Sequence, residues 1–269
     1  MNRAAKIKFI GDKLDELFPN PPIPLNYTNA FTMLVAVVLS AQCTDIRVNQ
    51  VTAVLFKHAD SPQKMLKLGV DRIAEIIKPC GFFNTKSVNI YKLSQTLVEK
   101  FKGEVPQTFD ELESLPGVGH KTASVIMSHI FKQPAFPVDT HIHRLAERWG
   151  LSDGSSVEKT EADLKKAFPK EEWEKRHLQI IYFGRTYCKA RGHKNEDCPI
   201  CSIVGKQSPS PMWRRRWILR STAFQPARII VSIVRCLRRR RRARAFVFRR
   251  RRWWRSCRTL IIRRWRHRT

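Results

Sequence analysis

The last quarter of this 269-residue chain lacks acidic residues, because no Asp or Glu follows Asp197. Lysine is also absent from residues 211–269, which nevertheless contain 22 arginines. Setting those 22 aside from the 51 basic residues leaves 29 against 23 acidic ones, so residues 1–210 carry only +6 of the net charge of +28. The body is therefore mildly basic, which suits a polyanionic partner without requiring one.

Long apolar runs are missing too. The longest, FTMLVAVVLSA at residues 31–41, is about half of the ~20 residues that a membrane-spanning helix needs. The charged N-terminus lacks the apolar segment of a signal peptide. The seven cysteines are odd in number, and three crowd between residues 188 and 201, which is typical of a metal site and not of a disulfide framework. We expect a cytoplasmic protein without a membrane segment.

The alternating pattern of β-strands is not found either. Apolar residues recur with helical spacing, interrupted by Pro, Gly and Asn. Either Thr28 or Asn29 is expected to cap the buried helix that follows. The connections are short, as in a compact all-α protein. The spacing predicts helices over 1–18, 30–40, 46–58, 62–68, 71–77, 84–101, 108–114, 120–131, 140–149, 155–167 and 171–186.

The stretch LPGVGHKTASVI at residues 115–126 predicts a helix-hairpin-helix. Pro116 ends a short amphipathic helix, Gly117 and Gly119 permit backbone conformations that side chains forbid, and a second helix begins at His120. The N–H groups that open a helix carry partial positive charge, so this turn could bind a phosphate without reading a base. The alternative is an ordinary tight turn between packed helices.

Lys121 is the second residue of that helix, and Ser124 and Ser128 share its face. An amine at the positive end of a helix, in a confined site, should have a lowered pKa and could act as a nucleophile. The alternative is a surface lysine. In PVDTHIHRL, Asp139 precedes another helix, where Asp is a favoured N-cap, so the residues alone favour a structural cap.

The chain resembles the endonuclease III family of DNA glycosylases. The resemblance rests on LPGVGHKTASVI followed by FPVDTHIHRLAERWGL, with VVLSAQCTDIRVN, CGFFNTKSVNI and GEVPQTFDELESLPGVG in support. It extends over residues 1–201 and implies a two-lobed, all-α helix-hairpin-helix glycosylase fold. Residues 22–133 would form a helical barrel with the hairpin, and residues 1–21 with 134–206 would form the second lobe.

The resemblance also implies a reaction. Lys121 would attack the deoxyribose of a damaged or oxidised pyrimidine nucleotide flipped out of the duplex, and Asp139 would assist. The resulting Schiff base would lead to β-elimination and a nick. The expected partner is double-stranded DNA with damaged bases or abasic sites, bound by a monomer. Two alternatives are a non-catalytic helix-hairpin-helix module, which would not need both residues, and an adenine-glycosylase relative, which would activate water without the lysine.

Further DNA-binding residues follow from the same resemblance. Gln42 and Phe82 match positions that fill the space left by the flipped base. An aromatic wedge at Phe82 is physically reasonable because stacking can replace the lost base; the alternative is a core residue. In the hairpin, the phosphate contacts are expected from Gly117, Val118, Gly119 and His120.

Cys188, Cys198 and Cys201 form a candidate metal site. The family commonly ligates a 4Fe–4S cluster with four cysteines spaced by six, two and five residues, whereas the first gap here is nine and the fourth cysteine, expected near Gln207, is missing. Three alternatives follow: the cluster with an unusual fourth ligand such as His193, zinc held by the three thiolates and His193, or no metal. The resemblance favours the iron–sulfur cluster.

Residues 207–269 form an Arg- and Trp-rich tail outside the resemblance, with five of the seven tryptophans. One interpretation is a nucleic-acid-binding arm, in which guanidinium groups neutralise phosphates and Trp stacks on bases. The other is a non-native segment, translated out of its proper reading frame, which the lack of both Lys and acids favours. Either way, self-repulsion predicts little order.

Overall fold

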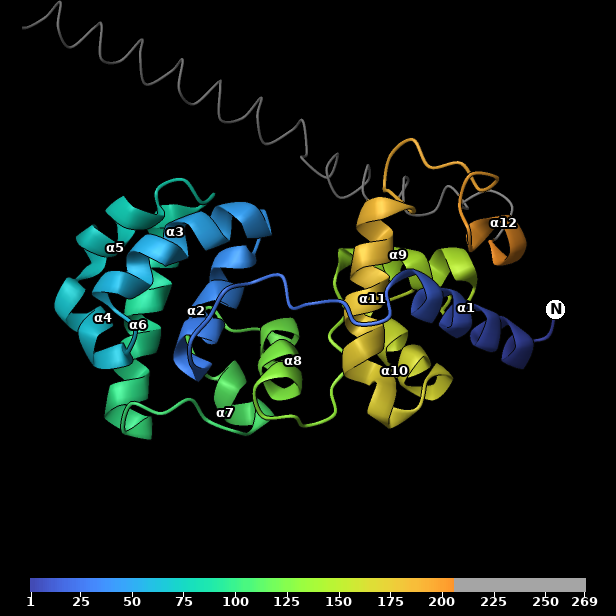
Figure 1. The fold of residues 1–269 in the computed structure, drawn as a ribbon. Coiled ribbons are helices and arrows are strands. Elements are labelled where there is room, and N and C mark those ends of the chain that lie inside the picture. The colour runs from blue at the N-terminus through green and yellow to red at the C-terminus, as the bar shows by residue number, and fades with distance from the viewer. Residues whose placement is uncertain (206–269) are drawn as a thin grey trace, which may run out of the picture. The chain divides into compact units, whose positions relative to one another are not determined.

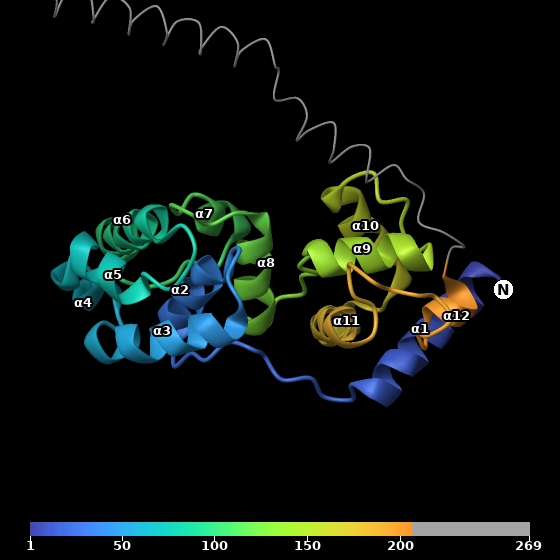
Figure 2. The ribbon, with the colours of Figure 1, turned by 90° about the horizontal axis from the view of Figure 1, so that it is seen from above.

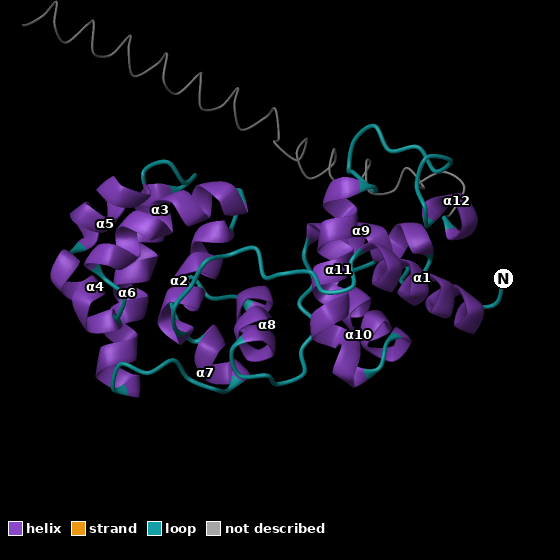
Figure 3. Cartoon of the chain, in the orientation of Figure 1, coloured by secondary structure: helices purple, strands orange, loops and turns teal. Residues whose placement is uncertain are grey.

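The structure is a computed structural model that describes residues 1–205. The tail, and with it the expectation of low order, lies outside the described residues. Within 1–205 there are helices and connecting loops but no strand (Figure 3), so the all-α class is confirmed. The helices are α1 (Arg3–Leu17), α2 (Ala30–Ser40), α3 (Asp45–His58), α4 (Pro62–Leu68), α5 (Val70–Ile77), α6 (Phe83–Phe101), α7 (Phe109–Glu113), α8 (His120–His129), α9 (Thr140–Trp149), α10 (Val157–Ala167), the 3₁₀ turn η1 (Lys170–Glu172), α11 (Trp173–Thr186) and α12 (Cys201–Val204).

Local signals in the sequence explain several helix starts. Of the two candidates before α2, Asn29 is the cap: its side chain accepts the Thr32 N–H at 2.8 Å, and the Thr32 hydroxyl accepts the Asn29 N–H at 2.9 Å. This reciprocal pair satisfies two otherwise unpaired donors. No helix among residues 1–205 is long and apolar enough to cross a membrane.

A first hydrophobic cluster forms around α2, which contacts α3, α6 and α8 (Figure 1). Every residue of α2 from Phe31 to Leu39 is buried. A helix that is apolar on all sides is stable only when neighbours cover all of its sides. The cluster begins at Leu25 and continues through the hairpin to Ala135. Lys121 is therefore carried on a helix, α8, that packs on the centre of this core.

A second hydrophobic cluster joins α1 to helices at the other end of the described chain, and it contains Trp149 and Phe183. Helix α1 packs against α11 (Figure 2), and a partly buried polar network joins the two helices. Arg176 donates to the Gly11 carbonyl at 3.0 Å and to Asp15 at 2.9 Å. Burial would raise the pKa of Asp15, but hydrogen bonds from Lys175, Gln179 and Arg176 lower it to about 2. This cluster includes Val138, the residue before Asp139, and Ile142, three residues after it, so Asp139 is held at the edge of the cluster.

Candidate active site

The hairpin consists of α7, the turn 114–119 and α8. Gly117 has φ = 82°, and an added Cβ would lie 3.0 Å from the Asn89 side chain, so glycine is needed there. Val118 is buried, and its N–H donates to the Leu115 carbonyl at 3.1 Å. Gly119 differs from the expectation: its φ of −107° is open to any residue. A Cβ there would meet nothing within 4 Å, so Gly119 leaves open space beside the helix start.

The starts of α8 and α9 differ in how their N–H groups are used. No side chain caps α8. At α9, the Asp139 carboxylate accepts the Ile142 N–H at 2.8 Å, so the predicted N-cap is present. The uncapped first turn of α8 keeps its partial positive charge available for an anion.

His120 is already engaged by carboxylates. Its ring nitrogens lie 2.7 Å from Glu113 and 3.0 Å from Glu161, and its ring stacks on Phe109 with centroids 5.6 Å apart. Burial alone would lower the pKa of His120, but the two carboxylates raise it. A DNA phosphate would compete with these carboxylates for the imidazolium, so the predicted contact of His120 stays a prediction.

Lys121 is half-buried in the first turn of α8. Burial lowers the pKa of its ammonium, and this effect outweighs the attraction of Asp139 and Asp45. Arg185, which forms a 2.6 Å ion pair with Asp45, lowers it further. The expected direction is therefore found, and its main cause is loss of water around the amine.

Two buried histidines lie behind this lysine, and sequence analysis missed them. The Nδ1–H of His177 donates to the Pro137 carbonyl at 2.8 Å, two residues before Asp139, and the His177 ring centroid lies 5.7 Å from that of His129. Burial, His129 and Lys121 lower the pKa of His177 to about 3. His177 is therefore neutral at physiological pH and adds no positive charge beside the lysine.

The two predicted wedge residues lie on adjacent loops. Phe82 has 66% of its surface exposed, so the core alternative is wrong. Gln42 is exposed as well, and both residues have positive φ, 53° for Gln42 and 58° for Phe82. A Cβ on Gly81 would lie 3.6 Å from the Gln42 carbonyl, which places the loops side by side. From α6, the buried Lys86 donates to the carbonyls of Leu39 at 2.9 Å and Ala41 at 2.6 Å.

The predicted metal-binding residues come together around the loop between α11 and α12. The ligand atoms of Cys188, His193, Cys198 and Cys201 all lie within 4.8 Å of one another. The Cys188 Sγ atom is 3.8 Å from both the Cys201 Sγ and the His193 Nε2 atoms. These four residues could hold a metal ion.

Comparisons with known proteins place the chain among DNA repair proteins. Residues 35–170 match the family model described as an HhH-GPD superfamily base excision DNA repair protein. Endonuclease III of Bacillus subtilis (strain 168) is 42% identical over 199 residues, which cover 74% of this chain and 91% of that protein. The chain belongs to the endonuclease III family. Endonuclease III of Escherichia coli (strain K12) is 41% identical over 200 residues, covering 74% of this chain and 94% of that protein.

Solved structures of endonuclease III share the fold. A non-covalent endonuclease III–DNA complex is 40% identical with a TM-score of 0.72, and the match covers 76% of this chain and 96% of that one. A trapped covalent endonuclease III–DNA intermediate is 40% identical with a TM-score of 0.73, covering 77% and 97%. The family and the helix-hairpin-helix glycosylase fold expected from the sequence are confirmed.

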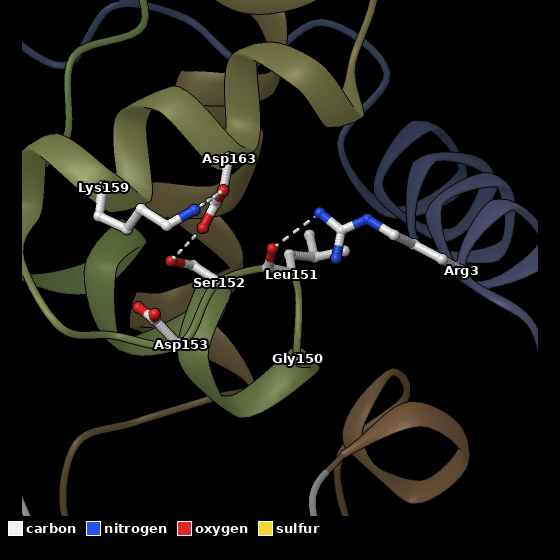
Figure 4. A pocket seen from close by; sticks show the side chains of 7 residues that line it. All are labelled: Arg3, Gly150, Leu151, Ser152, Asp153, Lys159 and Asp163. Carbon is white, nitrogen blue, oxygen red and sulfur yellow. Dashed lines mark hydrogen bonds and ion pairs between the residues drawn. The ribbon is translucent and has the colours of Figure 1, made fainter.

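A surface hollow of about 380 Å³ lies outside this site (Figure 4). Its polar groups are paired with one another: Arg3 donates to the Leu151 carbonyl at 2.9 Å, and Asp163 accepts from Ser152 at 2.9 Å and from Lys159 at 2.6 Å. None of its lining residues is a predicted site residue. The Arg3 bond attaches the start of α1 to the loop after α9, and the Ser152 bond attaches that loop to α10.

Proposed function

We propose that this endonuclease III family member is a bifunctional DNA glycosylase and abasic-site lyase of base excision repair. It excises damaged or oxidised pyrimidines from double-stranded DNA and nicks the strand through a lysine Schiff base. The main support is the position of Lys121: a half-buried amine with a lowered pKa, in the first turn of an uncapped helix, within the electrostatic reach of Asp139. We expect the enzyme to act in the cytoplasm as a monomer.

The reaction begins with the neutral amine of Lys121. Its lone pair attacks C1′ of the flipped nucleotide, the N–C1′ bond forms, and the bond from C1′ to the base breaks. The base leaves with the bonding electrons and takes up a proton. Ring opening then gives the imine, which acidifies the C2′ protons. Loss of one such proton breaks the C3′–O3′ bond and expels the 3′ phosphate.

Asp139 serves two purposes in this proposal. Its Oδ1 atom accepts the Ile142 N–H and fixes the carboxylate at the start of α9. Its negative charge stabilises the positive charge that develops on the sugar, and the carboxylate can take up the proton that the lysine must lose. Ser124, three residues after Lys121 in α8, has a buried hydroxyl without a hydrogen-bond partner among the described residues, which suits a polar substrate group nearby.

The DNA is held by the backbone at the hairpin and by side chains at the wedge loops. We assign the phosphate to the start of α8, where Gly117 and Gly119 shape the turn. Gln42 and Phe82 enter the duplex from their adjacent loops and replace the flipped base. The two lobes stay as expected from the resemblance, residues 22–133 and residues 1–21 with 134–206; the two hydrophobic clusters support this division, with Ala135 of the first cluster just past the expected boundary. The net positive charge of residues 1–210 also attracts the phosphates of the DNA.

The iron–sulfur cluster that the family resemblance implies is not matched by the described donors. A 4Fe–4S cluster is held by four cysteine thiolates, whereas here Cys188, Cys198 and Cys201 are joined by His193. Cys236 and Cys257 lie outside the described residues. The described residues therefore supply three of the four thiolates that the cluster needs, and no step of the reaction depends on it.

Borohydride trapping tests the nucleophile. On a duplex with one abasic site, the wild-type enzyme should give a covalent adduct that Lys121→Gln does not give. The trapping rate should rise with pH and level off below the ordinary lysine pKa of 10.5, since burial lowers the pKa of Lys121. An adduct that persists in Lys121→Gln would assign the nucleophile to another residue.

The substitution Asp139→Asn separates charge from capping. Asn is as good an N-cap as Asp, so the unfolding temperature should stay unchanged while single-turnover base excision falls about 10²- to 10⁴-fold. The matched control is Ser156→Ala, which removes the cap of α10. It should cost about 1 kcal/mol of stability and leave excision unchanged. Equal excision in Asp139→Asn and wild type would make Asp139 only a cap.

A further inference from the structure

We propose that Cys188, His193, Cys198 and Cys201 bind a single zinc ion in a closed tetrahedral site. His193 is the fourth ligand, through Nε2, and the site replaces a four-cysteine iron–sulfur cluster. This inference does not depend on the chemistry at Lys121. It rests on the donor set, the spacing of the ligand atoms and the groups that surround them.

The spacing of the ligand atoms suits one ion. A tetrahedron with Zn–S bonds of about 2.3 Å has neighbouring sulfur atoms about 3.8 Å apart. The Cys188 and Cys201 sulfur atoms are 3.8 Å apart, and the Cys188 Sγ to His193 Nε2 distance is also 3.8 Å. No two of the four ligand atoms are more than 4.8 Å apart. A 4Fe–4S cluster would spread its thiolates further, because each binds a different iron at the outside of a cube.

The donor types suit zinc as well. Three cysteines and one histidine form one of the usual structural zinc sites. The pair Cys198 and Cys201 is spaced by two residues, and the Cys201 N–H points to the Cys198 Sγ at 3.4 Å. Such an N–H bond orients a thiolate toward a metal, as outer-shell groups do in zinc sites. The short helix α12 then begins at Cys201 and holds the pair in place.

Helix α9 supplies the compensating charge. Three thiolates and one neutral imidazole around Zn²⁺ leave one net negative charge, and burying such a charge requires a partner. The Arg148 guanidinium donates to the Cys188 Sγ at 3.1 Å and to the Lys189 carbonyl at 2.9 Å. Arg144 donates to the Cys188 carbonyl at 3.0 Å. Three buried cysteines beside the Arg148 guanidinium are better explained by thiolates bound to a metal ion than by neutral thiols without a ligand.

The site would attach the loop after α11 to the second hydrophobic cluster. Cys188, Cys198 and Cys201 are all buried in that cluster. Because all four positions around the ion are taken by the protein, no position is left open for substrate or water. The zinc ion is therefore structural: it fixes residues 188–201 and takes no part in base excision.

Metal analysis of the purified full-length chain tests the proposal. Inductively coupled plasma mass spectrometry should find about one zinc and no stoichiometric iron per chain after growth with both metals. Replacing zinc by Co²⁺ should give the intense ligand-field and thiolate charge-transfer bands of a tetrahedral site. Iron with matching acid-labile sulfide, or no bound metal at all, would overturn the proposal.

Variants then identify the fourth ligand. His193→Ala should lower zinc affinity by at least about tenfold in a competition with a chromophoric chelator, in line with the loss of one ligand. His193→Cys should retain zinc and shift the cobalt charge-transfer bands, because a thiolate replaces imidazole. The control is the double variant Cys236→Ser/Cys257→Ser, which should bind zinc like the wild type. Loss of metal in that control, with none in His193→Ala, would place the fourth ligand in the tail and overturn the proposal.

Discussion

The hairpin turn and the two wedge loops both need positive φ, but they use it with opposite residue types. In the hairpin, Gly117 adopts φ = 82°. At the wedge loops, Gln42 and Phe82 adopt φ = 53° and 58° with full side chains, although the left-handed region is costly for them. The proposed function accounts for the difference: the hairpin would present its backbone to a phosphate, and the wedge loops would present side chains to the duplex.

Among residues 1–205, two other non-glycine residues have positive φ, and they show that the conformation alone does not mark a site. Lys102 has φ = 55° and follows the end of α6, where its N–H donates to the Leu97 carbonyl. Lys132 has φ = 52° shortly after α8. Left-handed residues are common where helices end. Phe82 instead precedes a helix and exposes an aromatic ring, so local helix geometry does not explain it.

Among substitutions in the hairpin turn and the wedge loops, the largest effect is expected from Phe82→Gly. Stacking of an aromatic ring on a base is worth about 1–3 kcal/mol, so base excision from a duplex should fall about tenfold or more. The free energy of unfolding should stay the same or rise by up to about 1 kcal/mol, because glycine relieves the left-handed strain. Single-turnover kinetics measure the excision rate, and urea unfolding of the same preparation measures the free energy of unfolding.

Lys102→Gly is the matched control, since Lys102 shares the backbone conformation but lies at a helix end. It should give the same gain in stability with excision unchanged. If Phe82→Gly also left excision unchanged, the wedge role of Phe82 would be lost and the contrast between the two kinds of loop would fail.

The next effect is that of Gly117→Ala. The added Cβ meets Asn89 at 3.0 Å and forces a left-handed alanine, which should cost about 1–2 kcal/mol of stability. Chemical denaturation followed by circular dichroism measures it. A neutral result would show that the turn does not need glycine at this position.

Lys86→Met tests the tether under the wedge loops. It removes the donor to the Leu39 and Ala41 carbonyls at the end of α2. Unpaired buried carbonyls cost about 1–3 kcal/mol, partly offset because the ammonium is no longer buried, so a net loss of about 1 kcal/mol is expected. Lys92→Met, exposed on the same helix, should be neutral. An equal loss in both variants would indicate a general effect of charge on α6.

The smallest effect is expected from Gly119→Ala. Its extended backbone and open surroundings should keep the change in stability within about 0.5 kcal/mol. Affinity for an abasic-site duplex, measured by fluorescence anisotropy, should fall severalfold because the methyl group enters the space beside the α8 amides. Unchanged affinity would move the phosphate away from this helix start.

Local signals made much of this site predictable. The sequence narrows the cap of α2 to Thr28 or Asn29 and predicts the cap at Asp139 and the turn at Gly117, because capping and turn formation depend on a few neighbouring residues. The sequence could not decide whether Phe82 lies in the core or is exposed as a wedge, because an apolar aromatic residue is typical of both positions. Lys86 gave no signal at all, because the carbonyls it reaches belong to a helix more than forty residues earlier.

The sequence by itself determined the helices, the hairpin and the family, and it made Lys121 and Asp139 the candidate catalytic pair, because helical periodicity, caps and motif residues act over short distances along the chain. Only the tertiary structure showed that burial is the main cause of the lowered pKa of Lys121, and only it brought the imidazole of His193 to three cysteine sulfur atoms. Both depend on burial by segments distant in sequence. Loss of water and convergence of ligands are properties of the packed chain.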